Sequence, residues 1–238
     1  MPTPAEVLSS MVASDPGRPR LTCYDDTPGP AQGERVELSA RVLANWVAKA
    51  GNLLQDDLDG SPATTVGLDL PAHWRAFYWA LAAWSCGATV VVGNGADTSD
   101  TVVTTDHHTA EQVAENAGLP VLVTLPMLAA ASLDAPRDVV DEARELPNYG
   151  DAFAPNEDPN LDDPALVAGD DARSFRHVVA SQPDWGANPR VRVPDDLHRA
   201  LLAALSAWAA DGSVVLVRSP AGDQTKRLAP ENITVDLS

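Results

Sequence analysis

Residues 161–179, LDDPALVAGDDARSFRHVV, contain groups whose order could bind a phosphate. A pair of acids precedes a short apolar run, which ends at Gly169 and is followed by a stretch with the pattern of a helix. A strand that leads through a glycine loop into a helix presents backbone amides to bound phosphates. In this chain the loop holds Asp170 and Asp171, whose carboxylates repel phosphate. The layout therefore indicates the frame of a nucleotide site that has lost its phosphate-binding groups.

Two other groupings could bind a metal. Asp106, His107 and His108 are adjacent, but neighbouring imidazoles on a strand or loop point apart, and no second cluster has ligand spacing. We expect an exposed turn there. The acid-rich residues 134–171 lack the D-x-D-x-D-G-x5-E spacing of a calcium loop, so we expect a solvated face. We predict no metal site.

A hydrolase triad could in principle use Ser181 with His177, His198 and one of many aspartates. The sequence has no G-x-S-x-G motif to place a serine on a strained turn, so composition alone explains these residues. We predict no catalytic residue. An unrelated hydrolase stays a minor alternative, which a broad esterase screen would test.

The elements that would position such groups alternate between helix and strand. Ser39 is a good N-cap for a long helix, residues 64–70 form a candidate buried strand, Pro71 opens a second helix, and residues 88–92 form another strand. This order implies right-handed crossovers onto a mostly parallel sheet, so residues 66–70 and 88–92 should be neighbouring parallel strands.

Flanking segments extend this pattern. Residues 21–26 and 34–38 read as a hairpin, and strands at 101–105 and 120–124 flank a helix at 110–117. Further on, Pro194 opens a helix that Gly212 ends before the strand 213–217. Its shared apolar face consists of Leu197, Leu201, Leu205 and Trp208.

The tryptophans could line an acyl pocket. Helical spacing instead makes most of Trp46, Trp74, Trp79 and Trp84 core residues. We expect Trp79 and Trp185 to be the exposed ones.

The charge pattern divides the chain. Residues 134–171 hold twelve acids against two arginines and several prolines, which predicts an acidic connector with at most one short helix, Arg137 to Leu146. We predict a first α/β subdomain at 1–133 and a second, incomplete α/β subdomain at 172–238.

Composition limits the partners and the compartment. The chain has 238 residues, 45% hydrophobic content and a formal net charge of −18, which supports a real core and argues against nucleic acid and anionic membranes. Cys23 and Cys86 lie far apart with no CxxC pair, so a reducing cytoplasm fits. The N-terminus shows no signal-peptide pattern and no stretch is long enough to span a membrane, so we expect a cytoplasmic protein.

Residues 36–92 resemble the N-terminal part of the adenylate-forming enzymes, the superfamily of acyl-CoA synthetases, peptide-synthetase adenylation domains and luciferases. In that family a helix of the type L-x-x-x-V-x-x-x-A-x-x-L leads to a strand with L-x-L-P, then to a helix ending in G-A and a valine strand. The matching positions are Leu43, Val47, Gly51, Leu54, Leu68, Leu70, Pro71, Gly87 and Ala88. Downstream, DDPALVAG is similar to the segment before the family's phosphate loop, and residues 197–217 are similar to its next helix and strand. The nearest specific resemblance is to a group of short actinobacterial proteins related to these synthetases.

The resemblance also shows what is missing. The family's phosphate loop, roughly T-S-G-T-T-G-x-P-K-G, uses glycines, hydroxyls and a lysine. The corresponding residues here keep Gly169, Ser174 and two arginines beside Asp170 and Asp171, so the resemblance implies a degenerate phosphate-loop position without ATP binding.

Other adenylation motifs also lack counterparts. NYGDAF at 148–153 lacks the Thr-Glu of the aromatic-Gly-x-Thr-Glu motif and comes before the loop. Gly222, Asp223 and Lys226 mimic the ribose-binding Gly-Asp and a catalytic lysine only by chance, since those elements belong to separate regions of a longer chain. The 238 residues contain no counterpart of the family's mobile C-terminal lid.

We therefore predict a three-layer α/β protein with mostly parallel sheets and flanking helices, similar to a truncated N-terminal domain of adenylate-forming enzymes. The expected function is that of a pseudoenzyme without a cofactor, which binds a protein partner or a small molecule, with homo-oligomerisation left open. The alternative is a half-enzyme of an acyl-adenylate-forming ligase, completed in trans by another polypeptide.

Overall fold

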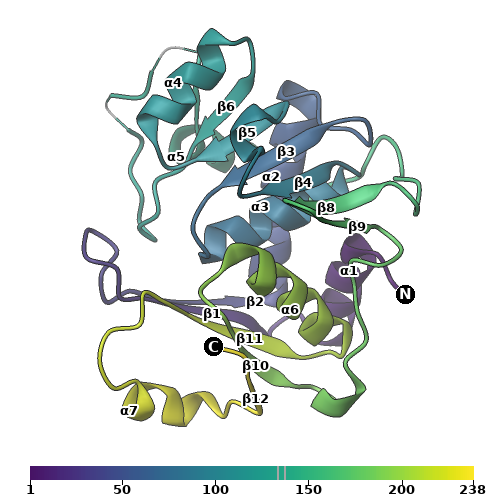
Figure 1. Cartoon of the computed structure of the whole chain (residues 1–238), viewed down its shortest axis with the longest axis vertical. Helices are drawn as coiled ribbons and strands as arrows, with labels where there is room; N and C mark the ends of the chain where they lie inside the picture. Colours follow the sequence, from purple (N-terminus) through teal and green to yellow (C-terminus); the bar gives the residue numbers. More distant parts are fainter. Residues whose placement is uncertain (133, 137) are drawn as a thin grey trace.

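The computed structural model describes residues 1–238 except 133 and 137, and arranges them around two sheets (Figure 1). The five-stranded sheet has the order β12-β10-β11-β1-β2 and the seven-stranded sheet the order β7-β6-β5-β3-β4-β8-β9. The strands of the five-stranded sheet are β1 (Pro19–Asp25), β2 (Arg35–Ser39), β10 (Arg190–Val193), β11 (Ser213–Arg218) and β12 (Val235–Asp236). The strands of the seven-stranded sheet are β3 (Thr65–Asp69), β4 (Thr89–Val92), β5 (Thr101–Thr104), β6 (Leu119–Leu122), β7 (Val140–Asp141), β8 (Pro164–Ala168) and β9 (Asp171–Ser174).

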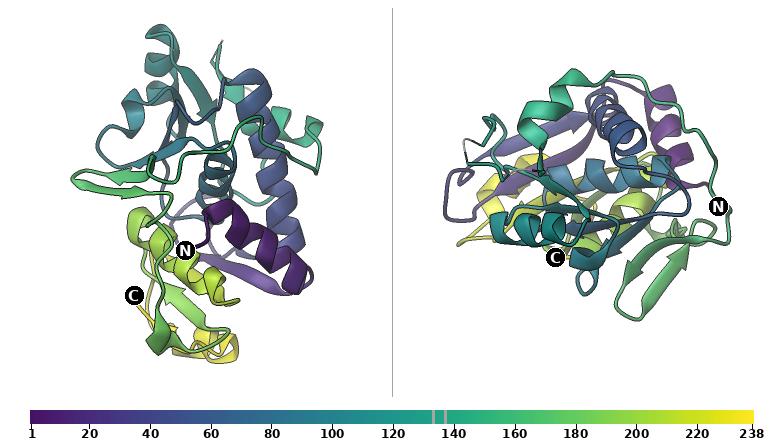
Figure 2. Two further views of the ribbon diagram at one scale, coloured as in Figure 1. Left: turned by 90° about the vertical axis from the view of Figure 1, so that its right-hand side faces the viewer. Right: turned by 90° about the horizontal axis from the view of Figure 1, so that it is seen from above.

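Helices lie between and around the two sheets (Figure 2). They are α1 (Pro4–Ser14), α2 (Ala40–Asp57), α3 (Trp74–Ser85), α4 (His107–Glu115), α5 (Glu142–Glu145), α6 (Leu197–Ala209) and α7 (Thr225–Leu228), with short 3-10 turns η1 (Ala96–Thr98), η2 (Leu146–Asn148), η3 (Pro183–Trp185) and η4 (Ala229–Glu231). Both sheets are parallel except for the pairs β1–β2 and β8–β9. The predicted α/β class with mostly parallel sheets and flanking helices is confirmed.

The segment from β3 to β4 has the predicted topology. The two strands are parallel neighbours, with Val66 opposite Val90, and α3 joins them. The hairpin of β1 and β2 is also present. Ser39 caps α2 by accepting a hydrogen bond from the backbone N–H of Val42 at 3.3 Å.

Helix α3 is the centre of the core. It contacts β1 of one sheet, β3 and β4 of the other, and helices α1, α2 and α6. Every residue from Trp74 to Trp84 is therefore buried, and the expectation that Trp79 is exposed is wrong. A helix enclosed by two sheets has no solvent-facing side. Trp185 is only partly buried.

The apolar face of α6 is buried as predicted. Leu201 and Leu205 are 1% and 0% exposed, and Trp208 packs edge-on against Phe77 of α3 at a centroid distance of 6.0 Å. The apolar face of α6 thus joins the five-stranded sheet to the central helix α3 in one continuous core.

The structure corrects two local expectations. Asp106 caps α4 by accepting from the backbone N–H of Thr109 at 2.8 Å, so His107 and His108 are exposed but begin a helix, not a turn. The predicted helix of Arg137 to Leu146 is shorter, because Val140 and Asp141 pair with β6 as strand β7 and the α-helix spans only Glu142–Glu145; Arg137 itself lies outside the described residues.

Each sheet contains strands from more than one of the three predicted segments. β1 and β2 pair within a sheet that also contains β10, β11 and β12, while β8 and β9 complete the seven-stranded sheet. The division at 1–133, 134–171 and 172–238 stays a prediction about domain organisation. None of the described helices is both long and apolar enough to cross a membrane.

Candidate ligand site at the strand ends

A pocket of about 500 Å³ lies at the carboxyl ends of β3, β4 and β8, where these strands face the start of α6. In an open parallel sheet the carboxyl ends of the strands are where ligands bind. The polar side chains at this strand-end pocket are Asp69, Asn94, Asp196 and His198, and Gly169 also lines it. The candidate position at Gly169 is thus part of a real concavity.

A tight hairpin occupies the place expected for a phosphate loop. Ala168 of β8 pairs with Asp171 of β9, which leaves only Gly169 and Asp170 between the strands. Gly169 has a φ of 59°, as the first position of a type II′ hairpin turn requires. The expected helix after this glycine is wrong, because the chain turns back and pairs with β8 as an antiparallel strand.

The carboxylate of Asp171 lies close to Arg173 and His198, two neighbours that the sequence pattern did not reveal. Arg173 donates from Nη2 at 3.1 Å, and His198 Nε2 lies 3.3 Å from Asp171 Oδ2. The hydrogen bonds from Arg173 hold the pKa of Asp171 below its usual range. The His198 contact lacks hydrogen-bond geometry, so Nε2 is close to a carboxylate yet buried without a hydrogen-bond partner. Asp170 is exposed at the turn.

Two further carboxylates border the pocket, one at the start of α6 and one at the end of β3. Asp196 is the N-cap of α6, and its Oδ1 accepts from the backbone N–H of Arg199 at 2.9 Å. The positive end of this helix is therefore already capped by an anion. Asp69, the last residue of β3, accepts from Thr104 Oγ1 at 2.6 Å. Sequence reasoning missed Asp69 and Asp196 as site residues, although each directly ends a strand or starts a helix.

The proposed hydrolase residues are not brought together as a triad. Ser174 Oγ lies 3.1 Å from His177 Nδ1, within the turn that follows β9. His177 and Ser181 are exposed, while His198 lies at the strand-end pocket. The Ser174–His177 contact is a local turn interaction, and the absence of catalytic residues stays a prediction.

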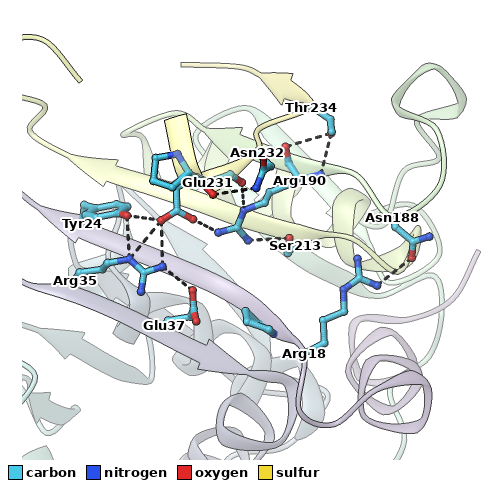
Figure 3. A pocket seen from close by; sticks show the side chains of 12 residues that line it. Arg18, Tyr24, Arg35, Glu37, Asn188, Arg190, Ser213, Glu231, Asn232 and Thr234 are labelled. Atoms are coloured by element: carbon cyan, nitrogen blue, oxygen red, sulfur yellow. Dashed lines mark hydrogen bonds and ion pairs between the residues drawn. The ribbon is translucent and has the colours of Figure 1, made fainter. Parts of the chain in front are cut away.

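A second pocket, of about 570 Å³, lies on the outer face of the five-stranded sheet (Figure 3). Glu231, which is 5% exposed, accepts hydrogen bonds there from Arg35, Arg190 and the Tyr24 hydroxyl. Arg18, at its other end, bonds to Asn188 at 3.1 Å. Glu231 belongs to the last turn before β12, so these side chains attach the C-terminal segment to the sheet. We interpret this pocket as structural because its arginines already have protein partners.

A buried ion pair lies under the seven-stranded sheet. Glu142 is 1% exposed and accepts from Arg75 Nη1 at 2.9 Å, from Trp79 Nε1 at 3.0 Å and from the Tyr78 hydroxyl. Burial raises the pKa of Glu142 to about 7, and the Arg75 charge opposes that rise. Arg75 also donates to the backbone carbonyl of Pro126 at 2.9 Å. This cluster borders none of the pockets described above and fixes residues near 126 and 142 onto α3.

In the part of the chain that the structure describes, no group of three or more histidine, cysteine, aspartate or glutamate side chains is placed to bind a metal ion.

Comparison with solved structures identifies the class of fold. Acetoacetyl-CoA synthetase from Streptomyces lividans aligns over 95% of this chain with a TM-score of 0.72 and 16% identity, and Brucella canis acyl-CoA synthetase over 98% with 0.73 and 13%. The N-terminal domain of FACL13 from Mycobacterium tuberculosis aligns over 98% with 0.67 and 14%. The chain spans only 40% and 46% of the two whole synthetases, and at these identities the likeness establishes the fold. It is the fold of the N-terminal domain of adenylate-forming enzymes.

No protein-family model matches the chain. A TIGR03089 family protein of Mycobacterium tuberculosis is 34% identical over 242 residues, covering 96% of this chain and 95% of that protein. The chain belongs to the TIGR03089 family.

Proposed function

We propose that this protein is a non-catalytic relative of the adenylate-forming enzymes that binds a small molecule at the strand-end pocket without using ATP. The β8–β9 hairpin carries the proposal. Only two residues connect its strands, so the turn offers few amides to a triphosphate, and one of the two is Asp170. A protein partner bound over the same pocket is the other form of this non-catalytic role.

The charges around the pocket support the same conclusion. Asp69 and Asp196 line it, and Asp171 is next to His198. The N-terminus of α6 could otherwise attract phosphate, but Asp196 caps it. A magnesium–ATP complex keeps a net negative charge and would meet carboxylates on several sides.

Calorimetry with magnesium–ATP at millimolar concentration tests the proposal. We expect no heat of binding from the natural protein or from the variant Asp170→Asn with Asp171→Asn, since neutral side chains do not lengthen the hairpin turn. Saturable binding by the natural protein with a Kd below about 1 mM would contradict the proposal. Binding by the variant alone would show that charge, and not turn length, excludes the nucleotide.

The alternative is a half-enzyme whose phosphate loop and lid come from another polypeptide. The chain's coverage of less than half of two whole synthetases supports this alternative. ATP-dependent pyrophosphate exchange, measured with and without candidate partner polypeptides, separates the two: exchange that needs both chains favours the half-enzyme.

We place the protein in the cytoplasm. Cys23 and Cys86 are both buried and unpaired, at 2% exposure each, which suits a reducing compartment. Burial raises the pKa of both thiols to about 12, so neither is set up as a reactive thiolate.

A further inference from the structure

The C-terminal segment, residues 219–238, lies across the outer face of the five-stranded sheet (Figure 1). Within these residues, all of which the structure describes, only Gln224 and Glu231 are buried, and both are polar. The apolar contacts of the segment come from Leu228 and Ile233, which are only partly buried against the sheet. A segment with so few buried apolar contacts opens more readily than the core does.

The carboxylate of Glu231 is bound as a ligand would be, by donors that converge from three strands (Figure 3). Oε1 accepts from Arg35 Nη2 at 3.1 Å and from the Tyr24 hydroxyl, and Oε2 accepts from Arg190. Burial alone would raise the pKa of Glu231, but the hydrogen bonds from these three side chains hold it below its usual range. The group is therefore an ionised carboxylate at neutral pH.

The three donors are also held in place by the sheet itself. The Tyr24 hydroxyl accepts from Arg35 Nε at 2.9 Å. Arg190 donates from Nη1 to Ser213 Oγ and from Nη2 to Thr22 Oγ1, both at 3.1 Å. Because these contacts do not involve the C-terminal segment, the donors stay arranged for a carboxylate when that segment moves away, and such preorganisation favours binding.

The space and the charge beside the carboxylate suit a larger acid. The pocket has a volume of about 570 Å³, which lies in the range of small-molecule sites. The net charge of −18 repels anions at long range, but salt screens this repulsion beyond about 8–10 Å. Inside the pocket the nearest charges after release of Glu231 include the guanidinium groups of Arg35 and Arg190, which match the geometry of a carboxylate.

We propose that the outer face of the five-stranded sheet is a carboxylate-binding site, which the chain's own Glu231 occupies and from which a small carboxylic acid displaces the C-terminal segment. Glu231 is then an internal inhibitor, because ligand binding and attachment of residues 219–238 exclude each other. The structural role of this pocket and its binding role differ only in which carboxylate fills it. The site is separate from the strand-end pocket, so its test does not depend on the function proposed above.

The variant Glu231→Ala empties the site, and acetate is the fragment that matches the atoms removed. We expect the variant to have a lower Tm than the natural protein. Sodium acetate at about 100 mM, a concentration suited to so small a ligand, should restore at least half of the lost Tm. Sodium chloride and the neutral isostere acetamide at the same concentration should restore none of it. Failure of acetate to restore Tm, or equal restoration by sodium chloride, would overturn the proposal.

The matched control is Asp236→Ala, which removes another carboxylate from the same segment. Its partner is Arg192 at 3.3 Å, and the Asp236 side chain is 52% exposed, so the pair lies at the surface. We expect acetate to change the Tm of this variant no more than it changes that of the natural protein. Equal restoration of both variants would show a general effect of acetate and would overturn the assigned site.

Hydrogen exchange on the natural protein tests the displacement itself and does not depend on a variant that folds. The backbone amides of Thr234 and Leu237 donate to the carbonyls of Arg190 and Arg192 at 2.9 Å, so their exchange reports attachment of the segment. A tethered carboxylate has an effective concentration of millimolar or more, so the free acid is used in excess, at about 500 mM. Exchange within residues 219–238 should be at least about twofold faster in sodium acetate than in sodium chloride, with the core unchanged. Equal exchange in the two salts would overturn the competition between ligand and segment.

Discussion

At pH 9, where the carboxylate of Glu142 is ionised despite its raised pKa, replacing it by glutamine should lower the free energy of unfolding by about 3–5 kcal/mol. The carboxylate is 1% exposed and accepts from Arg75 on one oxygen and from Tyr78 and Trp79 on the other. Whichever way a glutamine amide turns, its NH₂ group faces at least one of these donors. The substitution thus leaves the Arg75 charge buried without a counter-charge and adds an unfavourable donor–donor contact.

The expected loss is a large part of the stability of a domain, which is typically 5–15 kcal/mol. For a chain of this length about 1 kcal/mol corresponds to a change in Tm of roughly 2–4 °C, so Tm should fall by about 6–20 °C. The Arg75 side chain bonds to the carbonyl of Pro126 as well, so the effect should spread to the segment after β6.

Urea unfolding followed by tryptophan fluorescence measures the loss, with Glu111→Gln on the exposed face of α4 as the matched control. The m-value should stay unchanged in both variants. A loss below about 1 kcal/mol for Glu142→Gln would refute the reasoning, because it would mean that the pair is hydrated and not buried in solution.

Three further predictions concern α6, α3 and the hairpin. Leu205→Ala should cost about 2–5 kcal/mol in urea unfolding, since the side chain is 0% exposed; a cost under about 1 kcal/mol would show that this face is not packed. Burial lowers the pKa of His73 to about 3. The neutral ring therefore contributes fully to the free energy of unfolding above pH 6.5, and this contribution is lost as the pH falls towards 3. Asparagine at position 73 still caps α3 but does not titrate, so His73→Asn is the reference. Between pH 6.5 and pH 5 the free energy of unfolding of the natural protein should fall by about 2 kcal/mol more than that of the variant. Parallel pH profiles for the two proteins would contradict this. Asp171→Asn should cost no more than about 1 kcal/mol in the same unfolding assay, because its pair with Arg173 is exposed; a larger loss would indicate a stronger partner.

The parts of the fold that sequence could predict are those in which neighbouring elements decide the structure. The order of strand, helix and strand from β3 to β4, together with the right-handed crossover rule, leaves little choice of topology. The apolar face of α6 follows from helical spacing alone, and Leu201 and Leu205 are buried accordingly.

The predictions from sequence fail where contacts with a distant segment determine burial or secondary structure. Trp79 is buried because elements distant in sequence enclose α3, and its indole N–H donates to Glu142, 63 positions away. The stretch after Gly169 has helical spacing, but pairing with β8 makes it a strand. Tertiary contacts override local preference in both cases.

The candidate site could be predicted only in part, because local sequence patterns do not show which distant segments meet. The position of Gly169 came from the pattern of the surrounding chain, and it does line the pocket. Asp69 and Asp196 come from segments far from Gly169 in sequence, so no local spacing could bring them to the same place. Their carboxylates add to the negative charge around the pocket, which disfavours a bound phosphate.

The position of β1 also bears on how the protein is made. Leu21 pairs with Val214 in the five-stranded sheet, so β1 leaves the ribosome long before the strand that covers its free edge. The seven-stranded sheet consists of residues between 65 and 174 and can assemble earlier during synthesis. Until β11 is translated, the β1–β2 hairpin presents an unpaired strand edge, which is a site for aggregation and for chaperone binding. A chain interrupted before residue 213 would keep that edge of β1 exposed permanently.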